Sequence, residues 1–228
     1  MFMKDNSLCD ALVLSVTGEE ADHLAQIGDA AFSLIVKDSS LFSTIPFVST
    51  AISIYSIGTT IIERHLLKNL YRFIYRINCK TLALDERKKY IDKFNSKTKE
   101  ERNQELEYVV LFASKYMSED KPTMLADIYL SYINQEIELN EFVSYAEVLD
   151  RFLPGDSNTL MKESYNNIDD SLVSDSLLRL VALGLFVAYS KDVKTENTLN
   201  CIHIPANSKK DYILTDFGRK MKKCLSGC

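Results

Sequence analysis

Turn-forming residues are scarce in this chain. It holds 7 Gly and 4 Pro among 228 residues. A β-sandwich or a β-barrel needs many tight turns, and Gly and Pro supply the backbone angles for most of them. The scarcity therefore favours a mainly α-helical fold. Hydrophobic residues make up 46% of the chain and charged residues 26%, which is typical of a globular protein with a sizeable core.

Motifs that name a reaction are absent. The chain has no Gly-rich phosphate loop of the Walker type, no H-E-x-x-H and no G-x-S-x-G. Each of these motifs positions atoms for phosphate binding, zinc-assisted hydrolysis or nucleophilic attack. The three histidines, His23, His65 and His203, are isolated, and the carboxylates form no recognisable acid/base pair. We therefore predict a non-enzymatic protein with no cofactor and no small-molecule substrate.

Paired cysteine spacings are absent as well. The 5 cysteines are scattered, and no C-x-x-C occurs. An odd number of dispersed thiols fits a reducing cytoplasm better than a disulfide framework. The early apolar run is short and flanked by acidic residues, so we expect no signal peptide. The chain is therefore expected to be cytoplasmic.

Four residues near the end of the chain are the best candidates for zinc ligands: Cys201, His203, Cys224 and Cys228. The first two share a face of a predicted strand, and the last two share a face of a predicted helix. No pair among them has zinc-knuckle spacing, which structural zinc sites of this kind use. We therefore predict no metal site.

No part of the chain is strongly basic. The formal net charge is −5, made up of −2 over residues 1–79, −5 over residues 80–150 and +2 over residues 151–228. A general nucleic-acid binder is expected to carry a concentrated basic patch. This charge distribution argues against that class and marks residues 80–150 as an acidic segment.

The longest uncharged stretch covers residues 39–62, between Asp38 and Glu63. Its 24 residues are long enough to cross a bilayer, but ten of them are Ser or Thr, which oppose insertion. Pro46 fits the first turn of a helix, and one hydrophobic face and one hydroxyl-bearing face follow it. The pattern predicts a long hydrophobic helix, enclosed at the centre of an N-terminal domain. It continues past residue 62 or kinks at Gly58, where glycine costs a helix about 1 kcal/mol.

A conditional membrane segment is the alternative interpretation of the same stretch. In that case residues 39–62 are hidden in one state and insert into a bilayer after a trigger. The apolar residues that would meet lipid are Phe47, Ile52, Ile54, Tyr55, Ile61 and Ile62.

A row of cations follows directly, at strict i, i+4 spacing: Arg64, Lys68, Arg72 and Arg76. Aromatic residues are interleaved with it, so the row could bind phosphates of anionic lipid or of nucleic acid. A charge run is more often the water-exposed face of a helix. Under that interpretation the row pairs with the acidic segment at residues 80–150.

The clearest break in the chain is L-P-G-D at residues 153–156. It divides a helical domain, residues 1–153, from a second domain, residues 157–228. Within the first domain we expect helices at 85–94, 99–117, 122–134 and 141–152. Thr98 and Glu101 are predicted to form a capping box, and Asn140 is predicted to cap the last of these helices.

The second domain has a different pattern. A helix that ends at Gly184 is followed by a strand, and two further strands are predicted at residues 200–205 and 211–215, with a long polar hairpin in between the first strand and the last. A helix at residues 216–225 closes the domain.

The domain contains L-x-x-L-x-x-L-G-L at residues 177–185 and Y-x-L-T-x-x-G at residues 212–218. These patterns resemble the winged-helix superfamily over about the last third of the chain. The resemblance implies a winged-helix-like α+β domain, but it says little about function because such folds host many tasks.

A winged helix that reads DNA carries basic or amide side chains on the helix before the first wing strand. Here that region brings Asp169, Asp170 and Asp175, with Arg179 as its one cation. Acidic side chains facing phosphate lower the affinity for DNA. Contact with the DNA phosphate backbone through other surfaces remains an alternative, because the predicted hairpin and closing helix carry lysines. These are Lys209, Lys210, Lys220, Lys222 and Lys223.

Together these features predict a bacterial-type adaptor or regulatory protein. It would act by protein–protein contact through the helical and winged-helix-like domains, with a protein partner or a second copy of itself. One alternative is a membrane-acting effector, such as a toxin or a defence protein, whose basic row engages anionic headgroups at the membrane. The other alternative is a winged-helix regulator that binds DNA.

Overall fold

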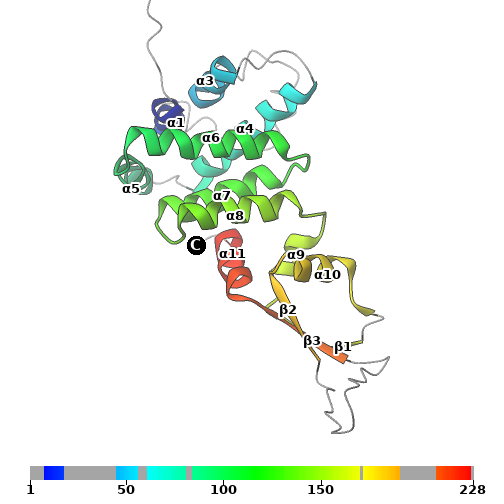
Figure 1. The fold of residues 1–228 in the computed structure, drawn as a ribbon. Coiled ribbons are helices and arrows are strands. Elements are labelled where there is room, and N and C mark those ends of the chain that lie inside the picture. The colour runs from blue at the N-terminus through cyan, green and yellow to red at the C-terminus, as the bar shows by residue number, and fades with distance from the viewer. Residues whose placement is uncertain are drawn as a thin grey trace, which may run out of the picture. The chain divides into compact units, whose positions relative to one another are not determined.

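A computed structural model describes residues 8–17, 45–55, 61–80, 84–169, 172–190 and 209–226. Helices predominate in these residues, and three strands form a small antiparallel sheet towards the C-terminal end (Figure 1). The mainly helical class predicted from the scarcity of Gly and Pro is thereby confirmed. The chain divides into two compact units, Met1–Asp150 and Arg151–Cys228.

Within the described residues, the first unit is entirely helical. Helix α4 packs against α6 and α7, α7 packs against α8, and α1 packs against α3 and α6. The helices of this unit are α1 (Leu8–Thr17), α3 (Pro46–Tyr55), α4 (Ile61–Lys80), α5 (Leu84–Asn95), α6 (Lys99–Lys115), α7 (Lys121–Ile133) and α8 (Leu139–Asp150).

The core of this unit lies along α4. Its apolar side chains recur every three or four residues, which places them on one face of the helix. The ring of Phe73 lies 5.5 Å from that of Tyr129 on α7 and 6.4 Å from that of Phe47 on α3, measured between ring centroids. Three helices therefore share one aromatic cluster. The apolar residues of α4 that are fully buried in this core are Leu70, Phe73, Ile74 and Ile77.

Helix α3 covers the described part of the uncharged stretch and packs against α1. Its backbone N–H at Phe47 donates to the buried Ser15 hydroxyl at 2.8 Å, which satisfies one of the open donors of its first turn. The stretch predicted as one long hydrophobic helix contains α3 and the start of α4. Residues 39–44 and 56–60 lie outside the described residues, so a single continuous helix is not confirmed. Within the described residues, none of the helices combines the length and the hydropathy that a membrane crossing needs.

Side-chain caps define two helix starts in the first unit. The Thr98 hydroxyl accepts from the Glu101 N–H, and the Glu101 carboxylate accepts from the Thr98 N–H at 2.9 Å, which confirms the predicted capping box. The predicted cap at Asn140 is wrong, because α8 already begins at Leu139. The Glu141 carboxylate accepts from the Glu138 N–H at 3.0 Å and thereby stabilises the earlier start.

The second unit combines short helices with the sheet. Strand β3 lies in the middle, in the order β1-β3-β2, and it pairs antiparallel with both neighbours. Strand β1 was not predicted from the sequence. The elements of this unit are α9 (Asp156–Leu160), β1 (Ser164–Asp169), α10 (Asp175–Ala182), β2 (Phe186–Ser190), β3 (Lys209–Leu214) and α11 (Asp216–Ser226).

The Y-x-L-T-x-x-G pattern has a physical explanation in the β3–α11 junction. Tyr212 and Leu214 are buried on one face of the sheet, and the Thr215 hydroxyl accepts from the N–H of Gly218 at 3.0 Å. A Cβ atom at Gly218 would lie 2.2 Å from the backbone oxygen of Leu185, so only glycine fits there. The pattern therefore sets how closely α11 approaches the start of β2.

Candidate functional site

The sheet of the second unit has one buried and one exposed face. Side chains alternate between the faces of a strand, so Ile213 lies on the face opposite to the buried Tyr212 and Leu214. Val187 is paired with Ile213 in the register of β2 and β3. Ile213 is 39% exposed and Tyr189, two residues after Val187, is 54% exposed. We call Val187, Tyr189 and Ile213 the apolar sheet face.

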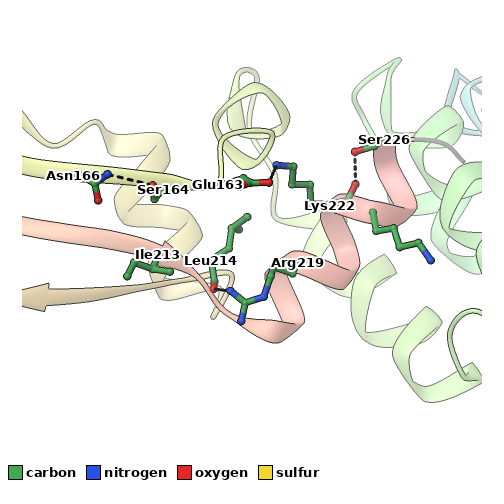
Figure 2. Close-up of a pocket in the computed structure, with 9 residues that line it drawn as sticks. Glu163, Ser164, Asn166, Ile213, Leu214, Arg219, Lys222 and Ser226 are labelled. Carbon is green, nitrogen blue, oxygen red and sulfur yellow. Dashed lines mark hydrogen bonds and ion pairs between the residues drawn. The ribbon is translucent and has the colours of Figure 1, made fainter.

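A pocket of about 660 Å³ lies in the same unit (Figure 2). Glu163, Ser164 and Asn166 line it at the β1 strand, and Ile213 and Leu214 line it on β3. Because Ser164 is the register partner of Ile213, these two residues share one face of the sheet. The remaining lining residues lie on α11: Arg219, Lys222, Lys223 and Ser226.

Three polar contacts hold Arg219 and Lys222 at the pocket. The Arg219 guanidinium donates to the backbone oxygen of Leu214 at 2.7 Å and to the Asp216 carboxylate at 2.6 Å. The Lys222 ammonium lies 3.7 Å from the Glu163 carboxylate, as Figure 2 shows. Glu163 is 90% exposed, and an exposed ion pair of this kind contributes at most about 1 kcal/mol to stability. Three cations and one carboxylate line the pocket, so its lining carries net positive charge.

The structure brings together only part of the predicted C-terminal cations. Lys222 and Lys223 line the pocket, whereas Lys220 lies on the exposed side of α11. Lys209 and Lys210 begin β3, at the opposite end of the strand from α11. Ser164 and Asn166, which lie more than forty residues upstream of β3, were not predicted as site residues. Predicting strand β1 and its pairing with β3 would have placed these two residues beside Ile213.

The basic row on α4 is engaged with the acidic segment where the structure describes it. Arg72 forms an ion pair with Glu119 at 2.7 Å, and this hydrogen-bonded contact lowers the pKa of Glu119. Arg76 donates to both carboxylate oxygens of the buried Asp127, at 2.8 and 2.9 Å. Lys68 is half-buried on the same helix, and the side chain of Arg64 lies outside the described residues. Two of the four cations are thus held by carboxylates of the same unit.

The apolar residues proposed for membrane contact differ in their exposure to solvent. Phe47 is completely buried, Ile52 is half-buried, and Ile54 is 52% exposed on α3. The side chains of Tyr55, Ile61 and Ile62 lie outside the described residues.

Helix α10 precedes β2, where a DNA-reading winged helix would carry its contacts. Its one cation, Arg179, donates to both carboxylate oxygens of Asp156, at 2.7 and 2.8 Å. Asp175 lies in the first turn of α10, and Asp169 ends β1. Asp170 falls outside the described residues. The cation of this helix is therefore part of an internal contact.

A buried polar cluster was not foreseen from the sequence. The Tyr132 hydroxyl donates to the buried Glu105 carboxylate, and the Lys97 ammonium lies 3.2 Å from that carboxylate and 3.4 Å from the centre of the Tyr132 ring. Burial raises the pKa of Tyr132, and the bond to Glu105 adds to that shift. The cluster connects Lys97, which precedes α6, with Glu105 on α6 and Tyr132 on α7. Its role is therefore to stabilise the packing of these segments.

Of the four cysteine and histidine residues weighed as zinc ligands, Cys224 is buried in α11. Cys201, His203 and Cys228 lie outside the described residues. Among the residues that the structure does describe, no cluster of three metal-ligating side chains is present.

No known family model, no curated protein and no solved structure matches this chain. The function is therefore argued from the two units and from the surfaces that they expose.

Proposed function

We propose that the protein is a non-enzymatic adaptor or regulatory protein that binds a protein partner through its C-terminal unit. The observation that carries the proposal is the apolar sheet face. Ile213 and Tyr189 are exposed on it while the opposite face of the same sheet is buried. Exposed large apolar side chains that gather on one surface mark interaction sites in soluble proteins, and an interface core is enriched in aromatic residues such as Tyr.

The arrangement of the unit supports a winged-helix-like fold. The strand order is β1-β3-β2, with α10 before β2. Residues 191–208, which include the predicted strand at 200–205, separate β2 from β3 in the sequence and lie outside the described residues. Since folds of this kind host many functions, the surface of the unit decides between partners. A cytoplasmic location, as expected from the thiols, is part of the proposal.

Binding to DNA is less well supported, because α10 offers no free cation to a groove. Arg179 is held by Asp156, and the remaining charged residue of that helix is Asp175. Because Asp156 balances the charge of Arg179 and Asp175 adds a carboxylate, this helix offers a phosphate backbone no net positive charge.

A membrane-acting effector is also less well supported. Phe47, Val48 and Ala51 are fully buried on α3, so their contact with lipid requires α3 to separate from α1. Arg72 and Arg76 would have to leave their carboxylate partners to engage headgroups. Both steps lose contacts that the resting fold makes.

The proposal is tested by isolating the complexes that the full chain forms in its native host. We expect a complex of defined mass that contains a second protein or a second copy of the chain, measured by size exclusion with light scattering. Ile213→Asp should abolish this complex, because it places a charge in the apolar sheet face. Leu111→Asp is the matched control, since Leu111 is similarly exposed on α6 of the other unit. A complex unaffected by Ile213→Asp, or one containing only nucleic acid or lipid, would refute the proposal.

A further inference from the structure

We infer that the pocket lined by Arg219, Lys222 and Lys223 is a binding site for a small organic anion with an apolar body. Its ligand class is a carboxylate or a phosphate monoester that carries an alkyl or aryl group. This site goes beyond the proposed function, because it adds a small-molecule effector to a protein that otherwise acts by partner contact.

The arrangement of α11 supplies the anion-binding part of the site. Residues 219, 222, 223 and 226 follow the i, i+3, i+4, i+7 spacing that places side chains on one helix face. Arg219 presents a planar fork of donors that matches carboxylate and phosphate oxygens. Its bonds to the Leu214 oxygen and to Asp216 keep the guanidinium at the pocket. A negatively charged head group is therefore the complementary ligand.

The carboxylate of Glu163 marks where a ligand anion would bind. It lies 3.7 Å from the Lys222 ammonium at an exposed position, so the two charges interact through a well-hydrated contact. A ligand carboxylate could take over this position next to Lys222 and accept from the Arg219 N–H groups other than those that donate to Leu214 and Asp216. Glu163 then acts as an internal competitor, because its charge repels the head group that Lys222 attracts.

The strand side of the pocket supplies apolar contact and neutral hydrogen-bonding groups. Ile213 and Leu214 line it with apolar atoms, and the mostly covered Lys222 stem adds methylene groups. Ser164 and Asn166 add a hydroxyl and an amide, whose side chains lie 3.4 Å apart. Cationic groups at one side of the pocket and apolar atoms at the other select an amphipathic anion over an inorganic ion.

The volume favours a whole small molecule. About 660 Å³ falls within the roughly 300–1,000 Å³ of pockets that enclose small ligands and cofactors. A bilayer surface cannot enter such a space, and an inorganic phosphate would leave most of it filled with water. A freely diffusing ligand of the class named above fits both the charge and the size.

The test uses the purified full chain and soluble probes below their micelle-forming concentration. Octanoate and hexyl phosphate are titrated by calorimetry, with octanamide as the uncharged control and acetate and inorganic phosphate as head groups without a body. We expect at least one charged amphipathic probe to bind saturably with a Kd below about 1 mM. The three control probes should bind at least tenfold more weakly. If neither charged probe saturates, or if octanamide binds as tightly as octanoate, the site does not exist as inferred.

Three variants locate the binding. Lys222→Gln with Lys223→Gln should weaken the charged probe at least tenfold, because it removes two charges and keeps most of each stem. Lys88→Gln with Lys89→Gln, an exposed pair on α5, should change the Kd less than twofold. Glu163→Gln should tighten binding about threefold, since the internal competitor loses its charge. Unchanged affinity in the Lys222/Lys223 double variant, or weaker binding in Glu163→Gln, would overturn the inference. Circular dichroism of each variant verifies the fold.

Ile213 belongs to both the pocket and the apolar sheet face, but the two experiments have separate readouts. If the charged probes do not bind but the partner complex forms, only the inferred ligand site is refuted. If the probes bind but no partner complex forms, only the proposed function is refuted.

Discussion

Arg179 on α10 and Asp156 at the start of α9 form a two-pronged ion pair, with donor–acceptor distances of 2.7 and 2.8 Å. Asp156 is completely buried, and the Ser176 hydroxyl and the Leu153 N–H also donate to it. A buried carboxylate needs such a set of donors to offset its lost hydration. The one cation of α10 therefore stabilises the second unit instead of facing outward.

Removing this cation should destabilise the second unit strongly. Arg179→Met keeps the length of the side chain but leaves the Asp156 charge buried without its counter-ion, which costs about 3–5 kcal/mol in comparable cases. Hydrogen exchange of the α10 amides measures the effect within this unit. The exposed Lys88→Met substitution is the control and should change α10 protection by less than about 0.5 kcal/mol. Equal protection in the two variants would show that the pair is not structural.

The same carboxylate predicts an acid-sensitive step. Burial would raise the pKa of Asp156, but the hydrogen bonds from Arg179, Leu153 and Ser176 outweigh it and hold that pKa below its ordinary value. Between the folded and unfolded pKa values the unfolded state binds more protons, so stability rises with pH there. The contribution of Asp156 is thus complete above about pH 4 and is lost as pH falls through the folded pKa.

Urea denaturation of the second unit between pH 2 and pH 6 measures this step. In the Asp156→Asn variant, which cannot titrate, the midpoint should be lower at pH 6 and should depend less on pH below 4. A variant with the same pH profile as the parent chain would assign acid sensitivity to other carboxylates.

The buried Glu105 cluster predicts a clear difference between two tyrosines on neighbouring helices. Tyr132→Phe removes the hydroxyl that donates to Glu105, and a charged acceptor left short of a donor costs about 1–3 kcal/mol. Tyr108→Phe is the matched control, because Tyr108 is a half-buried residue of α6. Thermal denaturation should show a lower Tm for Tyr132→Phe only. If both variants unfold at the same temperature, the hydrogen bond contributes nothing to stability.

The ion pair of Arg76 with Asp127 predicts a stability effect for the basic row. Arg76→Ala leaves the buried Asp127 with Lys80 at 4.0 Å as its remaining cation, so we expect a loss of about 1–3 kcal/mol. Denaturant titration of the first unit measures it. Lys68→Ala, about two turns earlier on the same helix, should cost less than about 0.5 kcal/mol. A larger loss of stability for Lys68→Ala than for Arg76→Ala would show that Arg76 is not held by a structural ion pair, and the basic row would again be a candidate binding surface.

Local patterns in the sequence predicted much of the fold. Contacts between residues far apart in the chain could not be predicted from it. The Thr98–Glu101 capping box was recognisable because its two residues are three positions apart. Strand β1 was missed because its sequence, SYNNID, is rich in Asn and Asp, which are poor strand formers. It is extended because it pairs with β3, more than forty residues later in the chain.

The candidate site shows the same division. Lys222 and Lys223 stood out as cations of a predicted closing helix, but a basic helix does not reveal a pocket. Ser164 and Ile213, which share the strand side of the pocket, come together only through the β1–β3 register. Likewise, Arg76 and Asp127 are 51 residues apart, and nothing in either local sequence indicates which charged residue pairs with which.

The most direct measurement is site-specific photo-crosslinking in the native host, with a photoreactive amino acid at Tyr189 on the apolar sheet face or at Met117 in the first unit. Met117 is the control, and at 80% exposure against 54% for Tyr189 it is at least as accessible to a partner. The account predicts that position 189 crosslinks repeatedly to one protein, identified by mass spectrometry, and that this adduct disappears when Ile213→Asp is added. Position 117 should not yield that adduct. If position 189 gives no protein adduct, or gives the same adducts as position 117, then the sheet face is not where this protein binds its partner.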